Sequence, residues 1–307
     1  MSKWRWIFIS LAYLVACTAF AGGKKTEILL LGNYCHDTLI LKSGKVQTLG
    51  GSVAYMANLL SQLDAKYEVI SKVGHDFLYL DQVLRAPLIV ENAKTTAFVD
   101  DFSGGERRSE VEAVCEPIFS NNIEYNEIEV AMIGGGAGEI LPETLSEVSK
   151  KAKILLVDAQ SLIYQAKSNG DQINSKLQDT PFYDELKRVT FLKVSREEAQ
   201  WMDLEEVRKR TQVLFTLNGD GFKILDKDHD WETAPHYPGV PAAVKDLTGA
   251  GDSFLAGFGY CLWKKYSLEK CARFANWCGA QAVESVGLPK LDPWTLRQEL
   301  EALKISR

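Results

Sequence analysis

The stretch KDLTGAGDSFLAGF, residues 245–258, holds the residues of this chain whose types and spacing are best suited to chemistry. Gly249, Ala250 and Gly251 form a turn of small residues, and the apolar spacing after it predicts a buried helix. A helix start bares backbone N–H groups, and the helix dipole adds partial positive charge there. The turn is therefore suited to holding an anion, phosphate above all.

Asp252, the acid that opens this helix, needs a separate explanation. A carboxylate stabilises a helix start, but it would repel a phosphate bound beside it. The same carboxylate makes sense as a general base that accepts a proton from a hydroxyl attacking the bound phosphoryl group. For an isolated pair of glycines, a capped helix after a glycine turn would be the simpler interpretation.

The arrangement resembles the second signature of the PfkB (ribokinase-like) carbohydrate kinases, in which Asp-x-Thr-Gly-Ala-Gly-Asp precedes a helix of small residues. Here the signature runs from Asp246 to Asp252. The resemblance implies that the Gly-Ala-Gly amides form an anion hole and that Asp252 is the catalytic base. Leu247 stands where the family usually has Pro or Thr, and we expect this to change the stiffness of the turn more than its chemistry.

The first third of the chain also resembles this family. Asp37 matches the acid that binds sugar hydroxyls, and Gly50 and Gly51 match the glycine pair beside the substrate. The family's frequent Asn four residues after that pair is replaced by Tyr55, so we expect a hydroxyl pattern other than that of ribose to be recognised. Without the downstream motif, the glycine pair would be a loop and Asp37 an exposed charge on an edge strand.

A nucleotide site is expected downstream. Residues 216–221, TLNGDG, end a strand in a tight turn that resembles the family's nucleotide loop, although alone such a turn is typical of a hairpin. The residues that the resemblance assigns to nucleotide binding are Thr216, Asn218, Gly219, Gly221, Thr248 and Asn276.

Glu198 aligns with the Glu of the family's Asn-x-x-Glu element, which organises magnesium and phosphates through water. Ser195 stands where Asn is usual, and Ser keeps one hydrogen-bonding oxygen but lacks the amide. An ordinary Ser N-cap with acids in the first helical turn fits the same residues equally well. The resemblance thus implies ATP and Mg²⁺ as cofactors.

From residue 129 onward apolar strands alternate with helical segments, which predicts a parallel sheet covered by helices, with sites at the carboxyl ends of the strands. Asp158 and Gln160 follow one strand and are expected to line the cleft. Residues 195–202 are expected to be helical, and residues 222–226 to pair with 231–234. Residues 37–49 form a hairpin-like pair too polar to be central, and residues 88–114 contain further strands, of which 106–114 alternate polar and apolar side chains as in an exposed sheet. Together they predict a small sheet, which as a lid would keep water from the bound ATP. The expected fold class is α/β: a ribokinase-like, mostly parallel central sheet flanked by helices, with a small β-sheet lid.

The composition limits the partners. With 307 residues and 46% hydrophobic content, the chain can bury one large core or two modest ones. A net charge of −6, without any basic stretch, argues against nucleic acid. Six cysteines show no Cys-x-x-Cys and no His at metal-ligand spacing, which is typical of reduced thiols in a cytosolic enzyme.

The N-terminal segment, residues 1–23, instead has features of an export signal. A basic start and the apolar run 6–16 precede Ala19-Phe20-Ala21, which suits a signal peptidase, and Leu14-Val15-Ala16-Cys17 looks like a lipobox. The run is short for a transmembrane helix. We place the kinase domain at residues 24–307 and expect a cytoplasmic protein, because ATP is scarce outside the cytoplasm. A membrane becomes a partner only if the segment is a real signal or lipid anchor.

Segments 31–37, 71–77 and 138–145 resemble plant-type inositol 3-kinases within the PfkB family. This resemblance implies a cyclitol such as myo-inositol as phosphate acceptor. Two alternatives stay open: a sugar or nucleoside kinase of the same family, against which Tyr55 counts, and a non-catalytic, exported ligand-binding relative. The lid sheet could also pair two copies of the chain as a homodimer, or simply cap the cleft.

Asp252→Asn should abolish turnover while leaving ATP binding largely intact, because the amide fills the same space but cannot act as the base. Steady-state kinetics and a nucleotide titration of the variant measure the two effects. Turnover within about tenfold of the wild type would contradict the assignment of Asp252 as the base.

Overall fold

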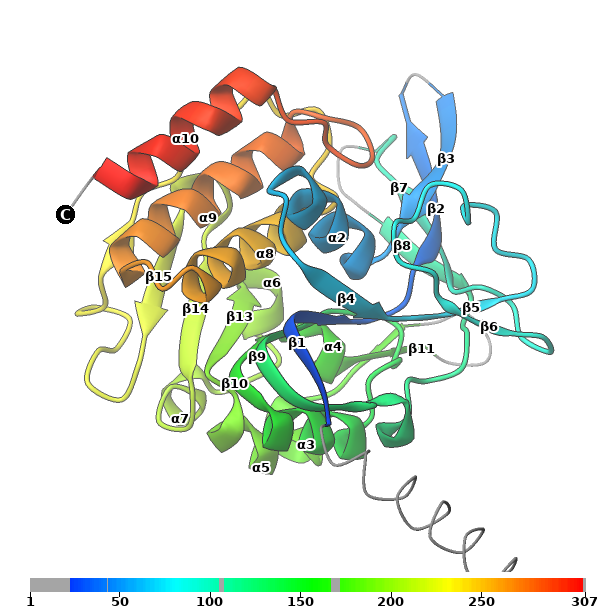
Figure 1. The fold of residues 1–307 in the computed structure, drawn as a ribbon, viewed down its shortest axis with the longest axis horizontal. Helices are drawn as coiled ribbons and strands as arrows, with labels where there is room; N and C mark the ends of the chain where they lie inside the picture. Colours follow the sequence, from blue (N-terminus) through cyan, green and yellow to red (C-terminus); the bar gives the residue numbers. More distant parts are fainter. Residues whose placement is uncertain (1–22, 43, 105–107, 167–171, 306–307) are drawn as a thin grey trace, which may run out of the picture.

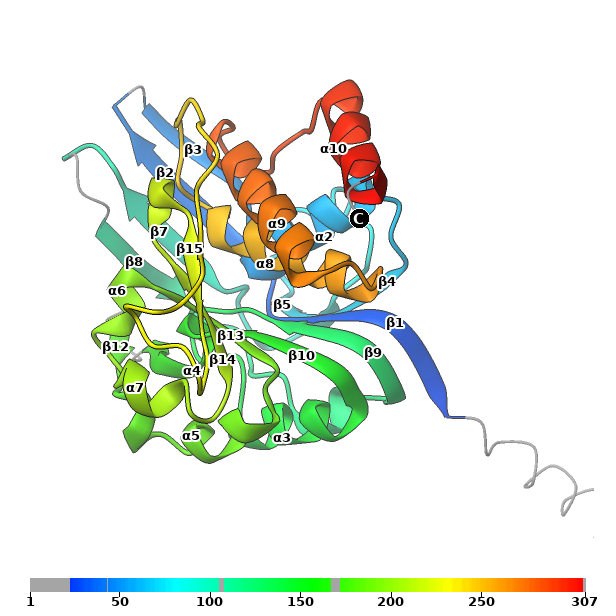
Figure 2. The ribbon, with the colours of Figure 1, turned by 90° about the vertical axis from the view of Figure 1, so that its left-hand side faces the viewer.

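The computed structural model describes residues 23–42, 44–104, 108–166 and 172–305, so the signal- or lipobox-like segment, apart from residue 23, lies outside the described residues. A central eight-stranded sheet divides the described chain into layers, with helices on both faces (Figures 1 and 2). Its strands, in spatial order, are β16 (His236–Tyr237), β15 (Phe222–Leu225), β14 (Gln212–Thr216), β13 (Phe191–Ser195), β10 (Ala152–Asp158), β9 (Tyr125–Ile133), β1 (Lys24–Leu31) and β4 (Tyr67–Ile70).

The strands from β14 to β4 pair in parallel, while β15 and β16 add at one edge in antiparallel fashion. The apolar run in β1 explains its central place. Ile28 and Leu30 belong to the core on one face of the sheet, and Leu29 and Leu31 to the core on the other. A strand covered on both faces needs such a continuous apolar run. The predicted α/β class with a mostly parallel sheet is confirmed.

Long helices cover one face of the sheet: α2 (Ser52–Gln62), α8 (Ala250–Trp263), α9 (Leu268–Val283) and, outermost, α10 (Pro293–Ile305). The opposite face carries α3 (Pro142–Lys151) and the shorter α4 (Gln160–Ile163), α5 (Phe182–Glu185) and α7 (Leu204–Val207), and α6 (Arg196–Ala199) follows β13 directly. The described 3₁₀ turns are η1 (Ser120–Asn122), η2 (Leu177–Asp179), η3 (Leu186–Arg188) and η4 (Asn218–Asp220).

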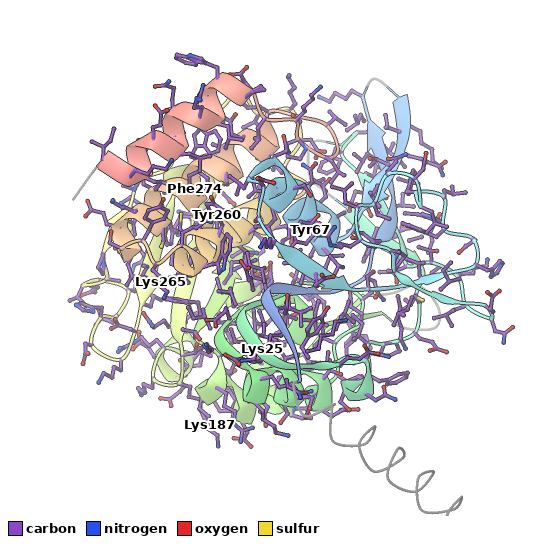
Figure 3. All side chains as sticks on the ribbon, viewed as in Figure 1. Lys25, Tyr67, Lys187, Tyr260, Lys265 and Phe274 are labelled. Carbon is purple, nitrogen blue, oxygen red and sulfur yellow. The ribbon has the colours of Figure 1, made fainter. Side chains whose placement is uncertain are left out.

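The helix predicted after Asp252 is α8, and it is buried on all sides from Ser253 to Cys261. A helix that is apolar all round belongs in the interior. Its neighbour α9 packs along it, and the ring of Tyr260 in α8 lies 6.0 Å from that of Phe274 in α9, as Figure 3 shows. Packing against α9 and α2 therefore fixes α8 in the interior.

A second, four-stranded sheet, called the lid here, stands to one side of the central sheet (Figure 1). Its strands, in spatial order, are β3 (Gly44–Gly50), β2 (Cys35–Leu41), β7 (Ala97–Asp101) and β8 (Arg108–Ala113). β6 (Leu88–Val90), which the sequence places with these strands, pairs instead with β5 (Lys72–Gly74), because the Leu88 N–H donates to the Ser71 carbonyl at 2.8 Å. β11 (Tyr164–Ala166) and β12 (Gln172–Asn174) form a separate antiparallel pair.

The expected hairpin of residues 222–226 with 231–234 is wrong in its second strand. β15 pairs with β16, and residues 231–234 form turns. Oδ1 of Asp230 accepts the N–H groups of Glu232 and Thr233, each at 3.0 Å, and this closes the turn. The helix expected at 195–202 is likewise shorter, because α6 ends at Ala199.

The described cysteines are free and buried, so their thiols serve packing. Among them, Cys271 and Cys278 lie on the buried face of α9. Within the described part of the chain, no helix is both long and apolar enough to cross a membrane.

Phe258→Ala should lower the free energy of unfolding by about 3–5 kcal/mol, because it leaves a cavity between α8 and the sheet. Phe258 is fully buried, and its ring lies 5.1 Å from that of Phe191 in β13. Urea unfolding measures the loss. The control, Trp294→Ala, removes a ring that is 70% exposed and should change stability by no more than about 0.5 kcal/mol. Equal losses in the two variants would contradict the assignment of Phe258 to the core.

Candidate active site

Asp246 shapes the turn that leads into α8. Its Oδ1 accepts hydrogen bonds from the Thr248 N–H at 3.0 Å and from the Thr248 hydroxyl at 2.7 Å. The backbone N–H of Lys245 donates to the carbonyl of Val283 at the end of α9, at 2.8 Å. The turn is thus fastened to itself and to α9 before the helix starts.

Gly249 is the N-cap of α8 and has a φ of 75°, in the left-handed region that favours glycine. The helix then begins at Ala250, and the Gly251 N–H is among those that a helix start leaves without an intrahelical acceptor. Asp252 is the acid of the first turn. The residues predicted to form the anion hole and to supply the general base therefore form one helix start, and the positive end of its dipole is suited to an anion.

Gly249 is also in contact with α2. A Cβ at this position would lie 2.0 Å from Cδ1 of Tyr55, so only glycine fits against the ring. Tyr55 itself is 1% exposed. The residue predicted to contact the acceptor thus packs directly on the turn predicted to hold the phosphoryl group.

Asp37, Gly50 and Gly51 come together at the base of the lid, next to α2. A Cβ on Gly50 would lie 1.9 Å from Cγ of Asp37, so the absence of a side chain there lets the carboxylate lie over the backbone. Gly51 is the N-cap of α2 with a φ of 87°, and a Cβ there would lie 2.3 Å from the Asn33 carbonyl oxygen. The glycine pair therefore allows β3 to turn into α2 beside Asp37.

The Tyr55 hydroxyl is buried and has no hydrogen-bond partner among the described residues. Burial raises the pKa of Tyr55, and the negative charges of Asp37, Asp246, Asp252 and Asp100 raise it further. Two of these carboxylates belong to the lid and two to the turn and first residues of α8. Groups from both parts of the site therefore raise the pKa of the same phenol. Tyr55 stays a neutral hydroxyl able to donate to one oxygen and accept from another.

Asp100 is a member of this group that the sequence did not reveal. It is 1% exposed and lies in β7, where Leu39 of β2 is its partner and Phe98 is the partner of Asp37. Since side chains alternate along a strand, Asp37 and Asp100 lie on the same face of the lid. The signal that would have revealed Asp100 is an acid at a strand position whose side chain faces the buried side of the sheet.

Lys193 forms a buried charge cluster with Asp158 and Glu198. Its Nζ lies 3.1 Å from Oδ2 of Asp158 and 3.4 Å from Oε1 of Glu198. Burial raises the pKa of both carboxyl groups, and one ammonium only partly offsets this. Burial lowers the pKa of Lys193, but the surrounding carboxylates outweigh it, so the pKa is raised and Lys193 is charged.

Glu198 is predicted either to cap a helix or to organise magnesium through water, and its two carboxylate oxygens have different partners. The Ser195 hydroxyl accepts the Glu198 N–H at 3.2 Å, and Oε2 of Glu198 accepts the Ser195 N–H at 2.7 Å, which makes a capping box. Its other oxygen faces Lys193. Glu198 is thus a helix cap whose carboxylate is also part of the charged cluster.

The donor set fits a metal held indirectly. In the described part of the chain, no group of three or more His, Cys, Asp or Glu side chains is placed to hold a metal ion. Buried carboxylates nevertheless stand beside the anion-binding turn. Mg²⁺ keeps several waters and binds phosphate oxygens readily, so acids that accept hydrogen bonds from its waters are sufficient.

Most of the residues predicted to contact nucleotide lie in or next to the turn after β14. Asn218 has a φ of 54° in the turn after β14, where the Leu217 N–H donates to the Gly221 carbonyl at 2.7 Å. A Cβ on Gly239 would lie 2.1 Å from the Gly219 carbonyl oxygen, so the loop after β16 packs on this turn. Asn276 of α9 donates to the carbonyl of Pro238 at 2.8 Å and to that of Tyr237 at 3.1 Å. Asn276 therefore fastens this loop to α9, and Thr248 follows farther along the same loop.

A parallel α/β sheet, a helix start suited to phosphate and a carboxylate in its first turn together define a phosphotransferase with an α/β kinase fold. A family model described as pfkB family carbohydrate kinase matches residues 145–294. Inositol 3-kinase of Oryza sativa subsp. japonica is 37% identical over 302 residues, which cover 92% of this chain and 75% of that protein. Inositol 3-kinase of Zea mays is 35% identical, covering 92% of this chain and 79% of that protein.

The chain therefore belongs to the pfkB family of carbohydrate kinases, and it is a phosphotransferase that uses an alcohol group as acceptor. A solved pyrophosphate-dependent kinase in the ribokinase family, complexed with a pyrophosphate analogue and myo-inositol, has a TM-score of 0.73 at 21% identity, over 90% of this chain and 99% of that chain. This likeness confirms the ribokinase-like fold.

Gly249→Ala should cost at least about 1 kcal/mol of stability for the left-handed φ alone, and it should lower turnover further because the methyl group displaces the Tyr55 ring. The matched control is Gly104→Ala, because a Cβ at Gly104 meets nothing within 4 Å. Thermal unfolding and steady-state turnover of both variants measure the effects. Unchanged turnover in Gly249→Ala would contradict the coupling of the two helices at this contact.

Proposed function

We propose that this protein transfers the terminal phosphoryl group of ATP to a hydroxyl of a cyclitol, with myo-inositol as the acceptor. The observation that carries the proposal is the contact of Tyr55 with Gly249. It joins the side of the site that carries Asp37 to the helix start that carries Asp252. An acceptor hydroxyl held against Tyr55 would lie next to both the base and the anion-binding turn.

Asp252 accepts the proton of the attacking hydroxyl in this mechanism. The N–H groups at the start of α8, from Gly249 to Gly251, stabilise the charge that develops on the transferring phosphoryl oxygens. Bound Mg²⁺ supplies further neutralisation of phosphate charge, and Glu198 with Asp158 would hold its waters. The chain's own contribution is mainly positioning and fixed electrostatics, which is what phosphoryl transfer requires.

The acceptor assignment rests on the relatives named inositol 3-kinase and on the chemistry of the acceptor side. Asp37 and Asp100 can only accept hydrogen bonds when ionised, so they suit a ligand rich in hydroxyl donors. Tyr55 adds a hydroxyl that both donates and accepts. A polyol ring meets these demands without needing an apolar or aromatic surface.

ATP is the donor that we propose, because the turn at residues 216–221 packs on the loop that Asn276 fastens to α9, and one turn farther along α9 a Cβ at Gly279 would lie 3.4 Å from the Ala250 carbonyl oxygen at the start of α8. The dependence on ATP favours a cytoplasmic protein, and the lid's outer strands, β3 and β8, are the surface that we propose for a homodimer. Pyrophosphate is the donor of the solved kinase described above, and it serves here as the competing donor in the assay.

Acceptor-dependent consumption of ATP by the purified protein tests the function. We expect turnover with myo-inositol and Mg²⁺, and little with hexoses, pentoses or nucleosides. Phosphorus NMR of the product identifies the hydroxyl that is phosphorylated, and parallel reactions with pyrophosphate identify the donor. Turnover of a sugar without any activity on myo-inositol would contradict the acceptor, and turnover with pyrophosphate alone would contradict the donor.

A further inference from the structure

Lys193, near the end of β13, has no role in the mechanism above. Its Nζ lies 3.2 and 3.1 Å from the two carboxylate oxygens of Asp158 and 3.4 Å from Oε1 of Glu198. The side chains of the three residues are 7%, 1% and 6% exposed. This is a built and buried cluster at the carboxyl ends of two neighbouring parallel strands.

Fold stability alone explains this cluster poorly. A buried ion pair is commonly no more stabilising than apolar residues of the same volume, because removing charges from water is costly. One carboxylate would neutralise the ammonium, yet Lys193 faces two, and the field of Asp252 reaches it as well. Burial raises the pKa of both carboxyl groups, so placing two acids around one ammonium in the interior is costly, and a purely structural device would avoid this arrangement.

The remaining side of the Lys193 ammonium faces the anion-binding turn. A Cβ at Gly251 would lie 3.0 Å from Nζ and 3.1 Å from Cε of Lys193. Because Gly251 carries no side chain, the ammonium lies against the backbone of the turn itself. A fixed positive charge at that place adds to the partial charge of the helix start, and both favour an anion on the turn.

We propose that Lys193 is a positioning residue for phosphoryl transfer. Its ammonium places a fixed positive charge behind Gly251 and holds Asp158 and Glu198 beside the bound phosphates. That the bound anion is the phosphate donor rests on the proposed function. The position of the Lys193 charge behind Gly251 does not depend on that function. Lys193 thus acts through the turn and the two acids rather than by touching the acceptor.

Two variants separate this role from a structural one. Lys193→Met leaves the two acids without their cation, so it should lose both stability and activity. The double variant Lys193→Met with Asp158→Asn removes both partners of the closest pair and should recover much of the unfolding temperature. It should nevertheless bind Mg²⁺–pyrophosphate at least about tenfold more weakly than the wild type and turn over about a hundredfold more slowly. The KM of the acceptor should stay within about threefold, because the acceptor side is untouched.

Calorimetric titration with Mg²⁺–pyrophosphate, thermal unfolding and steady-state kinetics provide the readouts. Asp158→Asn alone shows what the loss of that acid contributes, and Lys193→Arg, which keeps the charge, should retain most of the pyrophosphate affinity. The matched control is Lys153→Met, which removes a half-exposed lysine paired with Glu127 and Glu129 on the same sheet and should change neither affinity nor turnover.

Recovery of pyrophosphate affinity and turnover together with stability in the double variant would overturn the proposal, as would a wild type that binds no pyrophosphate. Equal losses of affinity in Lys193→Arg and Lys193→Met would also overturn it, because the charge would then not matter. Pyrophosphate binding needs no acceptor, so a wild type that binds it but phosphorylates no cyclitol would refute the proposed function and leave this result standing.

Discussion

The contact between the Tyr55 ring and Gly249 is the constraint on which the site depends. It joins α2, which starts beside Gly50 and Asp37, to the residue that caps α8. Gly249 needs its left-handed φ and has no room for a Cβ, so neither helix can shift without moving the other. The fold therefore sets the separation of acceptor side and phosphate side before any ligand binds. That preorganisation is the main catalytic resource of a phosphoryl-transfer enzyme.

Electrostatics divides the site into two halves around this contact. On the acceptor side, Asp37 and Asp100 act on a neutral Tyr55 that burial keeps protonated. On the other side, Lys193 and the start of α8 supply positive potential, which in our proposal favours the phosphate donor. The two halves meet at Asp252, whose carboxylate lies between the acids around Tyr55 and the positive charge of Lys193 and the start of α8. A base in that place can receive a proton from a hydroxyl while the anion beside it is held by fixed dipoles.

The sequence predicted those parts of the fold that have a local signal. The helix expected after Asp252 is α8, and the Gly-Ala-Gly turn forms the start of that helix, as its motif predicts. The pairing of β6 with β5 was not predictable, because strand partners are chosen by long-range contacts. The same holds for Lys193 and Asp158, which meet only because β10 and β13 are parallel neighbours. For Glu198, the local capping signal describes one of its two carboxylate oxygens, and the contact of the other with Lys193 had no signal in the sequence.

The acceptor side also gives a physical reason to prefer a cyclitol to a nucleoside in our proposal. A nucleoside brings a flat base that needs an aromatic or apolar surface, yet the face of Tyr55 is already taken by Gly249. Asp37 and Asp100 on the lid face are carboxylates, which accept hydrogen bonds from hydroxyl groups. A ring that carries a hydroxyl on every carbon can donate to the lid and to the α8 turn at once. In our proposal the lid therefore favours an acceptor with hydroxyl donors in several directions, whereas the start of α8 contributes to phosphate binding alone.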